Sequence, residues 1–371
     1  MIKSSKALIV LLVLTQLIFK EGIAQPQFDN NSPVAKLANA ISNANSTETV
    51  ILKADQPWEA GGLVYYSVFQ QDSLIRLYYL CDDTSRRRHL CYAYSTDGIN
   101  FTKPNLNLVQ FNGNKQNNIL NVLLDGACFF YDSASPEPYK ILGMNGNHKI
   151  HYAYSKDGIN FKLHLDSLVD YFADTQNQII YDPTQKKYKY YLRSYQYDDR
   201  IKTPYQKHYY YRAVAYYESK QLEDIRIHGN PERHPEGGKF SIISKEFPTI
   251  IDFDRSSKVE DDIYKPSVVR YGDGLYMAYP SIFHHYPKKN DGFNSVSLYI
   301  SNDGENFRLF KSDLIKEEPH SYYMAPGYAL KDNVVYNYYW KTLTTHTAAK
   351  RVSEYVVRAY KLSPEDAGLI K

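Results

Sequence analysis

An eight-residue turn motif occurs three times in the chain and constrains the fold more than any other feature of the sequence. Its copies are Tyr94–Phe101, Tyr154–Phe161 and Ile300–Phe307, and all three share the pattern Ser-x-Asp-Gly-x-x-Phe. A degenerate fourth copy, Tyr217–Ile225, lacks the Asp-Gly pair. Asp-Gly supplies the positive-φ positions of a tight turn between antiparallel strands. The serines stand at positions 95, 155, 219 and 301, which are 60, 64 and 82 residues apart, so the chain consists of repeating units.

Paired strand patterns accompany each copy of the motif. Arg76–Leu80 and His89–Tyr94 precede the first copy, and a fifth pair, Val334–Tyr339 and Glu354–Tyr360, follows the last copy without a turn motif. Tyr, which favours strands, accounts for 37 of the 371 residues. Short strands grouped into repeating units are typical of radial sheet architectures. The sequence therefore predicts an all-β fold, a five-bladed β-propeller of four-stranded antiparallel blades.

The first residues have the layout of a secretory signal peptide. Lys3 and Lys6 precede the apolar run 7–19, and the small-residue segment Gly22–Ala24 follows it. The apolar run has 13 residues and is too short for a membrane-spanning helix. We expect cleavage after Ala24 and export to the periplasm or the extracellular space, with no membrane attachment afterwards.

The rest of the chain is predicted to form a single domain. Residues 25–54 are expected to be a lead-in containing a short amphipathic helix, for which Ser32 is a suitable N-cap and Pro33 a suitable first residue. Residues 55–371 are expected to form the propeller, because no linker or shift in composition divides them.

Charge and cysteine content exclude several classes of protein. The chain has 44 Lys+Arg against 41 Asp+Glu, which is not the balance of a polybasic nucleic-acid-binding protein. Cys81 and Cys91 flank a polar hairpin loop and could form a bridge in an oxidising compartment, whereas Cys128 lies in an apolar strand. The spacing of Cys and His does not match a structural zinc site. We expect a monomer without metal or cofactor.

Acidic residues open each repeating unit. The first strands of a propeller line its central channel, so carboxylates at unit starts would converge on one pocket. Paired carboxylates are the groups that glycoside hydrolysis requires. The alternative is that each acid merely caps a turn. The catalytic candidates are Glu59, Asp125, Asp174, Asp262 and Glu318.

Several segments resemble the superfamily of five-bladed β-propeller glycosidases, which includes arabinanases, β-xylosidases and fructosidases, with the mannoside phosphorylases as relatives. The similarity is greatest to bacterial secreted proteins described only as glycosyl-hydrolase-like propellers, and it extends over the mature chain. The segments that carry the resemblance are Trp58-Glu59, Tyr78-Tyr79, Cys91–Ile99, Lys103–Leu106, Asn117-Asn118, Asp174–Asn177, Tyr191–Ser194 and His346.

The resemblance implies a base Asp, an orienting Asp and an acid Glu from successive blades. Glu59 or Asp125, then Asp174, then Asp262 or Glu318 would occupy these places. The chain departs from the family in two respects. The fructosidase signature Trp-Met-Asn-Asp-Pro-Asn is absent, and Glu59 stands where an Asp is expected, so the assignment of acid and base stays open.

Other polar and aromatic residues are candidates for binding substrate. Arg193 could bind a sugar carboxylate, sulfate or phosphate. Neutral His is a common partner of sugar hydroxyls, and Trp58 could stack on a pyranose ring. Each of these residues could instead be structural. The full set of candidates is Arg193, His346, Trp58, Asn177, Tyr264, His285 and His320.

These observations together favour an exported glycoside hydrolase that acts on an oligosaccharide or polysaccharide fragment by paired-carboxylate acid/base catalysis. A non-catalytic carbohydrate-binding propeller is the first alternative. A glycoside phosphorylase is the second, and it would need a cluster of cations for phosphate. Carbohydrate is the expected partner in each case.

Overall fold

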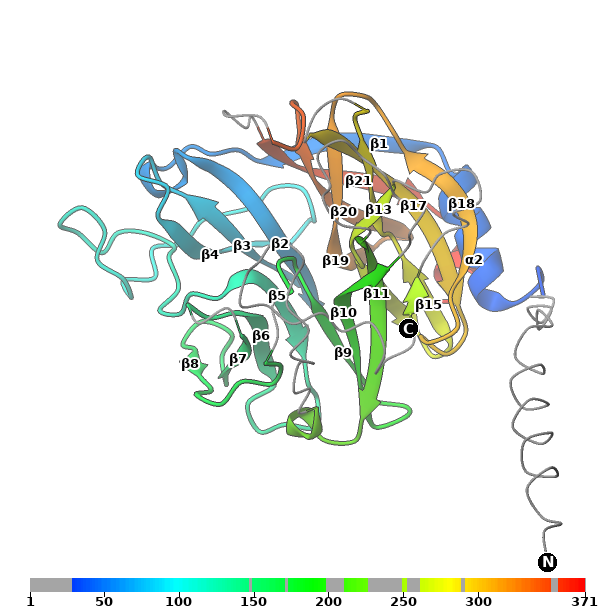
Figure 1. Ribbon diagram of the computed structural model, residues 1–371, viewed down its shortest axis with the longest axis horizontal. Helices are drawn as coiled ribbons and strands as arrows, with labels where there is room; N and C mark the ends of the chain where they lie inside the picture. The colour runs from blue at the N-terminus through cyan, green and yellow to red at the C-terminus, as the bar shows by residue number, and fades with distance from the viewer. Residues whose placement is uncertain are drawn as a thin grey trace, which may run out of the picture.

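The computed structural model describes residues 29–146, 149–170, 173–197, 210–225, 249–251, 261–287, 291–347 and 353–370. The predicted signal peptide, residues 1–24, lies outside the described residues. Five antiparallel sheets surround a common centre (Figure 1). The prediction of a five-bladed β-propeller is confirmed, although the number of strands varies from blade to blade.

The first three blades follow one another along the chain. The first contains β2 (Gly62–Gln71), β3 (Leu74–Asp82) and β4 (Arg88–Ser95). The second contains β5 (Asp125–Tyr131), β6 (Tyr139–Met144), β7 (Ile150–Ser155) and β8 (Lys162–Leu163). The third contains β9 (Gln178–Asp182), β10 (Lys187–Tyr197), β11 (Tyr210–Ser219) and β12 (Thr249–Ile251).

The fourth blade is interrupted in its two inner strands. Pro266 separates β13 (Asp262–Lys265) from β14 (Val268–Gly272), and Pro280 separates β15 (Leu275–Ala278) from β16 (Ser281–His285). Proline cannot donate to a sheet ladder, so both breaks have a direct cause in the sequence. The outer strands β17 (Gly292–Ser301) and β18 (Arg308–Ile315) complete the blade.

The fifth blade joins the two ends of the described chain. It contains β19 (Ser321–Lys331), β20 (Val334–Thr342) and β21 (Ser353–Lys361), and β1 (Ser46–Leu52) pairs with β21. The segment predicted as a lead-in thus supplies the outer strand of this blade, a role that the sequence pattern did not predict. The pairing of β1 with β21 joins the N-terminal segment to the last blade and so closes the ring.

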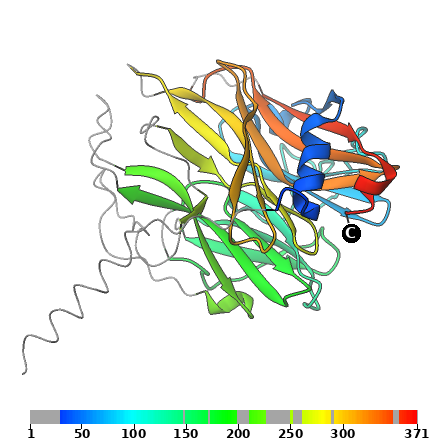
Figure 2. The same ribbon diagram turned by 90° about the vertical axis from the view of Figure 1, so that its right-hand side faces the viewer.

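Two short helices pack against the fourth and fifth blades. The predicted N-terminal helix is present as α2 (Pro33–Asn43), and Ser32 caps it through a hydrogen bond from Ala35 N. Its buried face packs against β15 and β17, and α3 (Pro364–Ala367) lies next to it (Figure 2). No helix among the described residues is long and apolar enough to cross a bilayer.

The repeated turn motif has one geometry in all three copies. In the first, Ser95 Oγ accepts hydrogen bonds from Asp97 N and Gly98 N, and the Asp97 carboxylate accepts from Ile99 N and Asn100 N. The hydrogen bonds to the carboxylate, led by those from the backbone and side chain of Asn100, hold the pKa of Asp97 well below its usual range. The glycines at positions 98, 158 and 304 have φ of 83°, 76° and 76°.

Tyrosine hydroxyls connect these turns to neighbouring blades. Tyr338 of the fifth blade donates to Gly98 O (3.1 Å), Tyr78 of the first to Gly158 O (3.0 Å), and Tyr191 of the third to Gly304 O (2.7 Å). All three tyrosines are buried. The excess of Tyr in the sequence thus serves the packing between blades.

We expect Gly158→Ala to lower the free energy of unfolding by about 1–3 kcal/mol, because Ala disfavours this left-handed backbone. A Cβ at Gly158 would also lie 2.7 Å from the Tyr78 hydroxyl. Gly146→Ala is the matched control, because a Cβ there meets nothing within 4 Å. Urea unfolding of both variants checks the prediction, and equal midpoints would contradict it.

Cys81 and Cys91 face each other on β3 and β4. Their sulfur atoms lie 3.5 Å apart, and both side chains are buried as free thiols, as is Cys128. The structure therefore has the hairpin geometry predicted for this pair without the covalent bond.

Candidate active site

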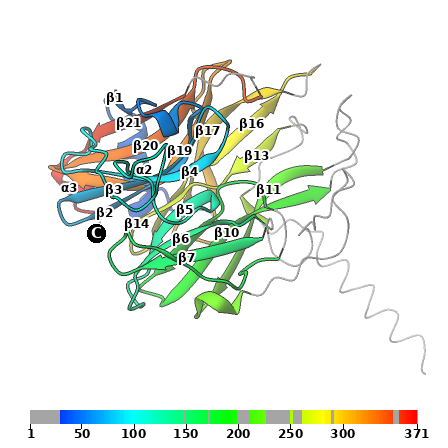
Figure 3. The ribbon, with the colours of Figure 1, turned by 90° about the vertical axis from the view of Figure 1, so that its left-hand side faces the viewer.

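The inner strands of the five blades begin at the same end of the ring, which we call the mouth. The first residues of these strands and the loops that precede them carry most of the predicted site residues. β11, β13 and β16, which contain Arg212, Asp262 and His285, lie side by side at this end (Figure 3).

Asp262 is a buried carboxylate at the start of β13, with 2% of its surface exposed. It accepts hydrogen bonds from Arg212 N (2.8 Å), Arg212 Nη1 (3.2 Å) and His285 Nε2 (3.0 Å). Burial alone would raise its pKa, but the hydrogen bond from His285 and the charge of Arg212 lower the pKa below its ordinary value. Asp262 is therefore ionised at neutral pH and is not a proton donor.

Arg193 connects the third blade to the fourth. Its guanidinium group donates to the backbone carbonyls of Asp174 and Tyr264, and it lies 4.8 Å from the centre of the Tyr264 ring. Its backbone N–H donates to Asn177 Oδ1 (2.8 Å). Arg193 and Asn177 thereby fix the loop before β9, and the Asp174 side chain on this loop is exposed.

Aromatic rings from three blades line the mouth. The hydroxyls of Tyr65 and Tyr264 lie 3.1 Å apart, and the ring of Trp340 stacks on Tyr323. His346 Nδ1 lies 2.7 Å from the Tyr323 hydroxyl, and the His346 ring contacts Tyr264. Burial, then Tyr264 and the Asp174 carboxylate, raise the pKa of Tyr65 well above its usual range. The mouth therefore combines flat apolar surfaces with polar groups, a combination suited to sugar rings.

Known proteins resemble this chain in fold but do not match it in sequence. No family model matches the sequence, and no curated protein matches it. Three solved structures share the architecture at low identity. The complex of BT0996 with RGII has 10% identity over 87% of this chain and 94% of that protein, with a TM-score of 0.54. The α-L-arabinofuranosidase PaAbf62A from Podospora anserina, in complex with cellotriose, has 10% identity over 87% and 98%, with a TM-score of 0.50.

The GH32 β-fructofuranosidase BmSUC1 from Bombyx mori has 11% identity over 89% of this chain and 66% of that protein, with a TM-score of 0.51. The chain has the five-bladed β-propeller fold of glycoside hydrolases. This agrees with the superfamily resemblance carried by the sequence motifs.

Six of the predicted residues come together in the mouth of the propeller: Asp174, Arg193, Asp262, Tyr264, His285 and His346. Four more residues at this site were not predicted from the sequence: Tyr65, Arg212, Tyr323 and Phe283. The ring of Phe283 lies 5.1 Å from that of His346. Arg212 stands just before the strand pattern that begins at Ala213, and nothing in the sequence pairs it with Asp262, 50 residues away.

Glu59 stands just before the first inner strand, but it is fully buried between the first blade and the loop before it, and its hydrogen-bond partners are not among the six residues above. It accepts hydrogen bonds from the Tyr79 hydroxyl (2.6 Å) and Lys103 Nζ (2.7 Å), and from Asp55 N and Gln56 N. These contacts occupy both of its oxygens and give it a structural position.

The remaining candidates lie in other surroundings. Trp58 is buried and donates to Asn118 Oδ1 (2.9 Å). Asp125 is half-exposed at the start of β5 and forms an ion pair with Arg88. Glu318 is exposed, and His320 lies 3.2 Å from the carboxylate of Glu317.

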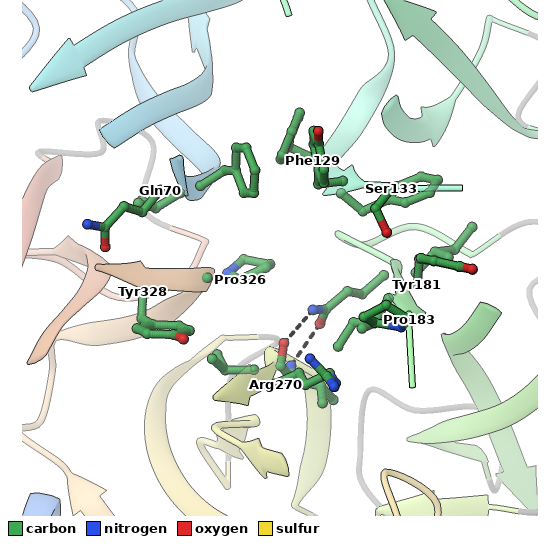
Figure 4. A pocket seen from close by; sticks show the side chains of 18 of the residues that line it. Gln70, Phe129, Ser133, Tyr181, Pro183, Arg270, Pro326 and Tyr328 are labelled. Atoms are coloured by element: carbon green, nitrogen blue, oxygen red, sulfur yellow. Dashed lines mark hydrogen bonds between the residues drawn. The ribbon is translucent and has the colours of Figure 1, made fainter. Parts of the chain in front are cut away.

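A cavity of about 550 Å³ lies at the opposite end of the ring (Figure 4). All five inner strands line it with mainly apolar and aromatic side chains, and the amides of Gln70 and Gln178 are bound to the backbones of Leu330 and Val268. Asp72 is the only acidic residue among the described residues that line it. Because Asp174 and Asp262 both lie at the mouth, whereas Asp72 alone among the described acids lines this cavity, we place the candidate active site at the mouth.

Metal-ligating side chains do not cluster in the described part of the chain. No three His, Cys, Asp or Glu side chains among those residues are placed to hold one ion.

Proposed function

We propose that this protein is an exported glycoside hydrolase that binds an oligosaccharide at the mouth, with Asp174 and Asp262 as its catalytic carboxylates. The observation that carries the proposal is that one connected set of side chains at the mouth holds two unlike carboxylates from adjacent blades. Asp262 is buried and ionised, whereas Asp174 is exposed. Arg193 connects their strands, and the aromatic rings of the mouth surround them.

The two environments suit two roles. Glycoside hydrolysis needs one group that protonates the leaving oxygen and one carboxylate anion that attacks the sugar carbon or activates the water that attacks it. Asp262 supplies the anion, because His285 and Arg212 keep it ionised. Asp174, whose carboxyl group is open to the substrate, takes the other role in this proposal. Tyr264 and Phe283 provide ring faces for the apolar side of the sugar.

A screen of plant and algal oligosaccharides tests the proposal. Each sugar is incubated with the wild type and with Asp174→Asn, and both the release of reducing ends and the binding are measured. We expect at least one sugar to be cleaved by the wild type and not by the variant. Equal cleavage by both proteins would contradict the assignment.

Export is supported by the sequence of residues 1–24 alone. Intact-mass measurement of the protein recovered from the periplasm or the culture medium tests it, with Gln25 as the expected first residue. A full-length chain found only in the cytoplasm would contradict export.

A carbohydrate-binding propeller without catalysis is the second candidate. It is favoured by the saturation of the other acids: Asp262 by Arg212 and His285, Glu59 by Lys103, and Asp125 by Arg88. This candidate predicts binding in the same screen with no reducing ends released from any sugar.

A further inference from the structure

Lys265 lies on the axis of the propeller, directly below the mouth. It is the last residue of β13, and the break at Pro266 and Ser267, where Ser267 has a φ of 48°, turns the chain at this level. Only 2% of Lys265 is exposed. Its Nζ donates to Gln176 Oε1 (2.5 Å) and to the carbonyl of Met324 (2.6 Å).

These two contacts extend to all five blades. Gln176 precedes the third blade and donates to Ala127 O of the second (2.8 Å) and Tyr66 O of the first (3.1 Å). Met324 belongs to the fifth blade, and its carbonyl also accepts from Ser267 Oγ of the fourth (2.7 Å). We call this set of hydrogen bonds the axial hub. It separates the mouth from the cavity at the other end of the ring.

The ammonium group of Lys265 has no carboxylate within 4.0 Å among the described residues. The titratable groups that face it are the Cys128 thiol from β5 and the Tyr65 ring from β2, whose centre lies 5.7 Å from Nζ. The other buried lysines differ, since Lys189 lies 3.4 Å from Glu218 and Lys140 3.9 Å from Asp132. Burial lowers the pKa of Lys265 to about 7.

The hub holds three segments of the mouth. Gln176 is two residues from Asp174, Lys265 follows Tyr264, and Met324 follows Tyr323. Thr175 Oγ1 also donates to Tyr264 O (3.0 Å), so the loop that carries Asp174 is fixed to the strand that carries Tyr264. Hydrogen bonds from a charged donor are roughly twice as strong as those from a neutral one.

We propose that Lys265 is a positioning residue whose protonated amine ties together the segments that carry Asp174, Tyr264 and Tyr323, and whose deprotonation weakens these ties and loosens the mouth while Lys265 itself stays shielded from water. Its consequences for catalysis rest on the proposed function, but the loosening itself does not. The tests below therefore include measurements that need no substrate.

The first test is hydrogen exchange at peptides that cover residues 173–178 and 322–325, measured by mass spectrometry at pH 6 to 8.5. After correction for the intrinsic rate, we expect protection in the wild type to fall several-fold as the pH rises through about 7. Lys265→Arg should keep its protection over this range, because a guanidinium group does not lose its proton. Equal pH dependence in the wild type and Lys265→Arg overturns the proposal.

The second test is urea unfolding as a function of pH. Global unfolding, unlike the local loosening of the mouth, exposes Lys265 to water. Between pH 7 and about 10.5 the unfolded chain therefore holds the Lys265 proton and the folded chain does not, so global unfolding becomes less favourable as the pH rises. Relative to Lys265→Met, the unfolding equilibrium constant of the wild type should fall by up to about tenfold per pH unit in this window. Parallel curves for the two proteins overturn the titration of Lys265.

The third test uses kcat/KM on a sugar cleaved in the screen. We expect the wild-type value to decline on the alkaline side of about pH 7, Lys265→Met to lack this decline, and Lys265→Arg to extend the plateau. Lys189→Met, which removes a buried lysine with a carboxylate partner, should leave the profile unchanged. If no sugar is cleaved, the proposed function fails and the first two tests decide the role of Lys265. If cleavage occurs with the same profile in wild type and Lys265→Met, the positioning role fails.

Discussion

Asp262→Asn is expected to lower kcat on a cleavable oligosaccharide by about 10²–10⁴-fold, the usual contribution of a positioned acid or base. Asparagine keeps the shape of the side chain next to Arg212 and His285 but removes the negative charge. The reaction then lacks the carboxylate anion that attacks the sugar carbon or activates the water that attacks it. Initial rates at saturating substrate measure the effect, and Asp174→Asn is expected to cause a loss of similar size through the missing proton donor.

Two control experiments distinguish a catalytic role of Asp262 from a purely structural one. Asp125→Asn removes a carboxylate at the start of another inner strand, where Arg88 already neutralises it, and it should leave kcat within a few-fold of the wild type. Urea unfolding of Asp262→Asn shows whether the variant is folded at the assay temperature. A folded Asp262→Asn with wild-type turnover would overturn the assignment of Asp262.

The fold could be predicted from the sequence because its decisive interactions are local. The hydrogen bonds of each turn connect residues at most three positions apart, as between Ser95 and Gly98. The Asp-Gly pair and the preceding Ser are therefore visible as a motif. The closing strand β1 could not be predicted in the same way, because its pairing with β21 spans about 300 residues and depends on the curvature of the whole ring.

From the sequence, only those site residues could be predicted whose place in the fold follows from their position along a strand. Asp174, Asp262 and Tyr264 were found because they stand where inner strands begin. Arg212 was missed because its role depends on its ion pair with Asp262, which forms across a blade boundary and leaves no pattern in the sequence. Lys265 stands next to Tyr264 in the sequence, yet nothing in the pattern distinguishes a buried axial lysine from an exposed one.

Glu59 is the clearest case in which position alone misleads. Its place before the first inner strand matches that of a catalytic carboxylate, but a 3₁₀ turn at Pro57–Glu59 directs the side chain toward Lys103 and Tyr79. We expect Glu59→Ala to lower the free energy of unfolding by roughly 3–5 kcal/mol, the cost of removing one partner of a buried ion pair. The loss also leaves Asp55 N and Gln56 N without their acceptor.

Glu59→Gln separates this structural position from a catalytic one. The amide oxygen can still accept from the two backbone N–H groups, while the ion pair with Lys103 is lost, so the variant should unfold at a urea concentration between those of the wild type and Glu59→Ala. Because the hydrogen-bond partners of Glu59 are not among the six predicted residues of the mouth, the folded variant should retain kcat within a few-fold. A stable Glu59→Gln that loses turnover as Asp262→Asn does would move the catalytic centre toward the first blade.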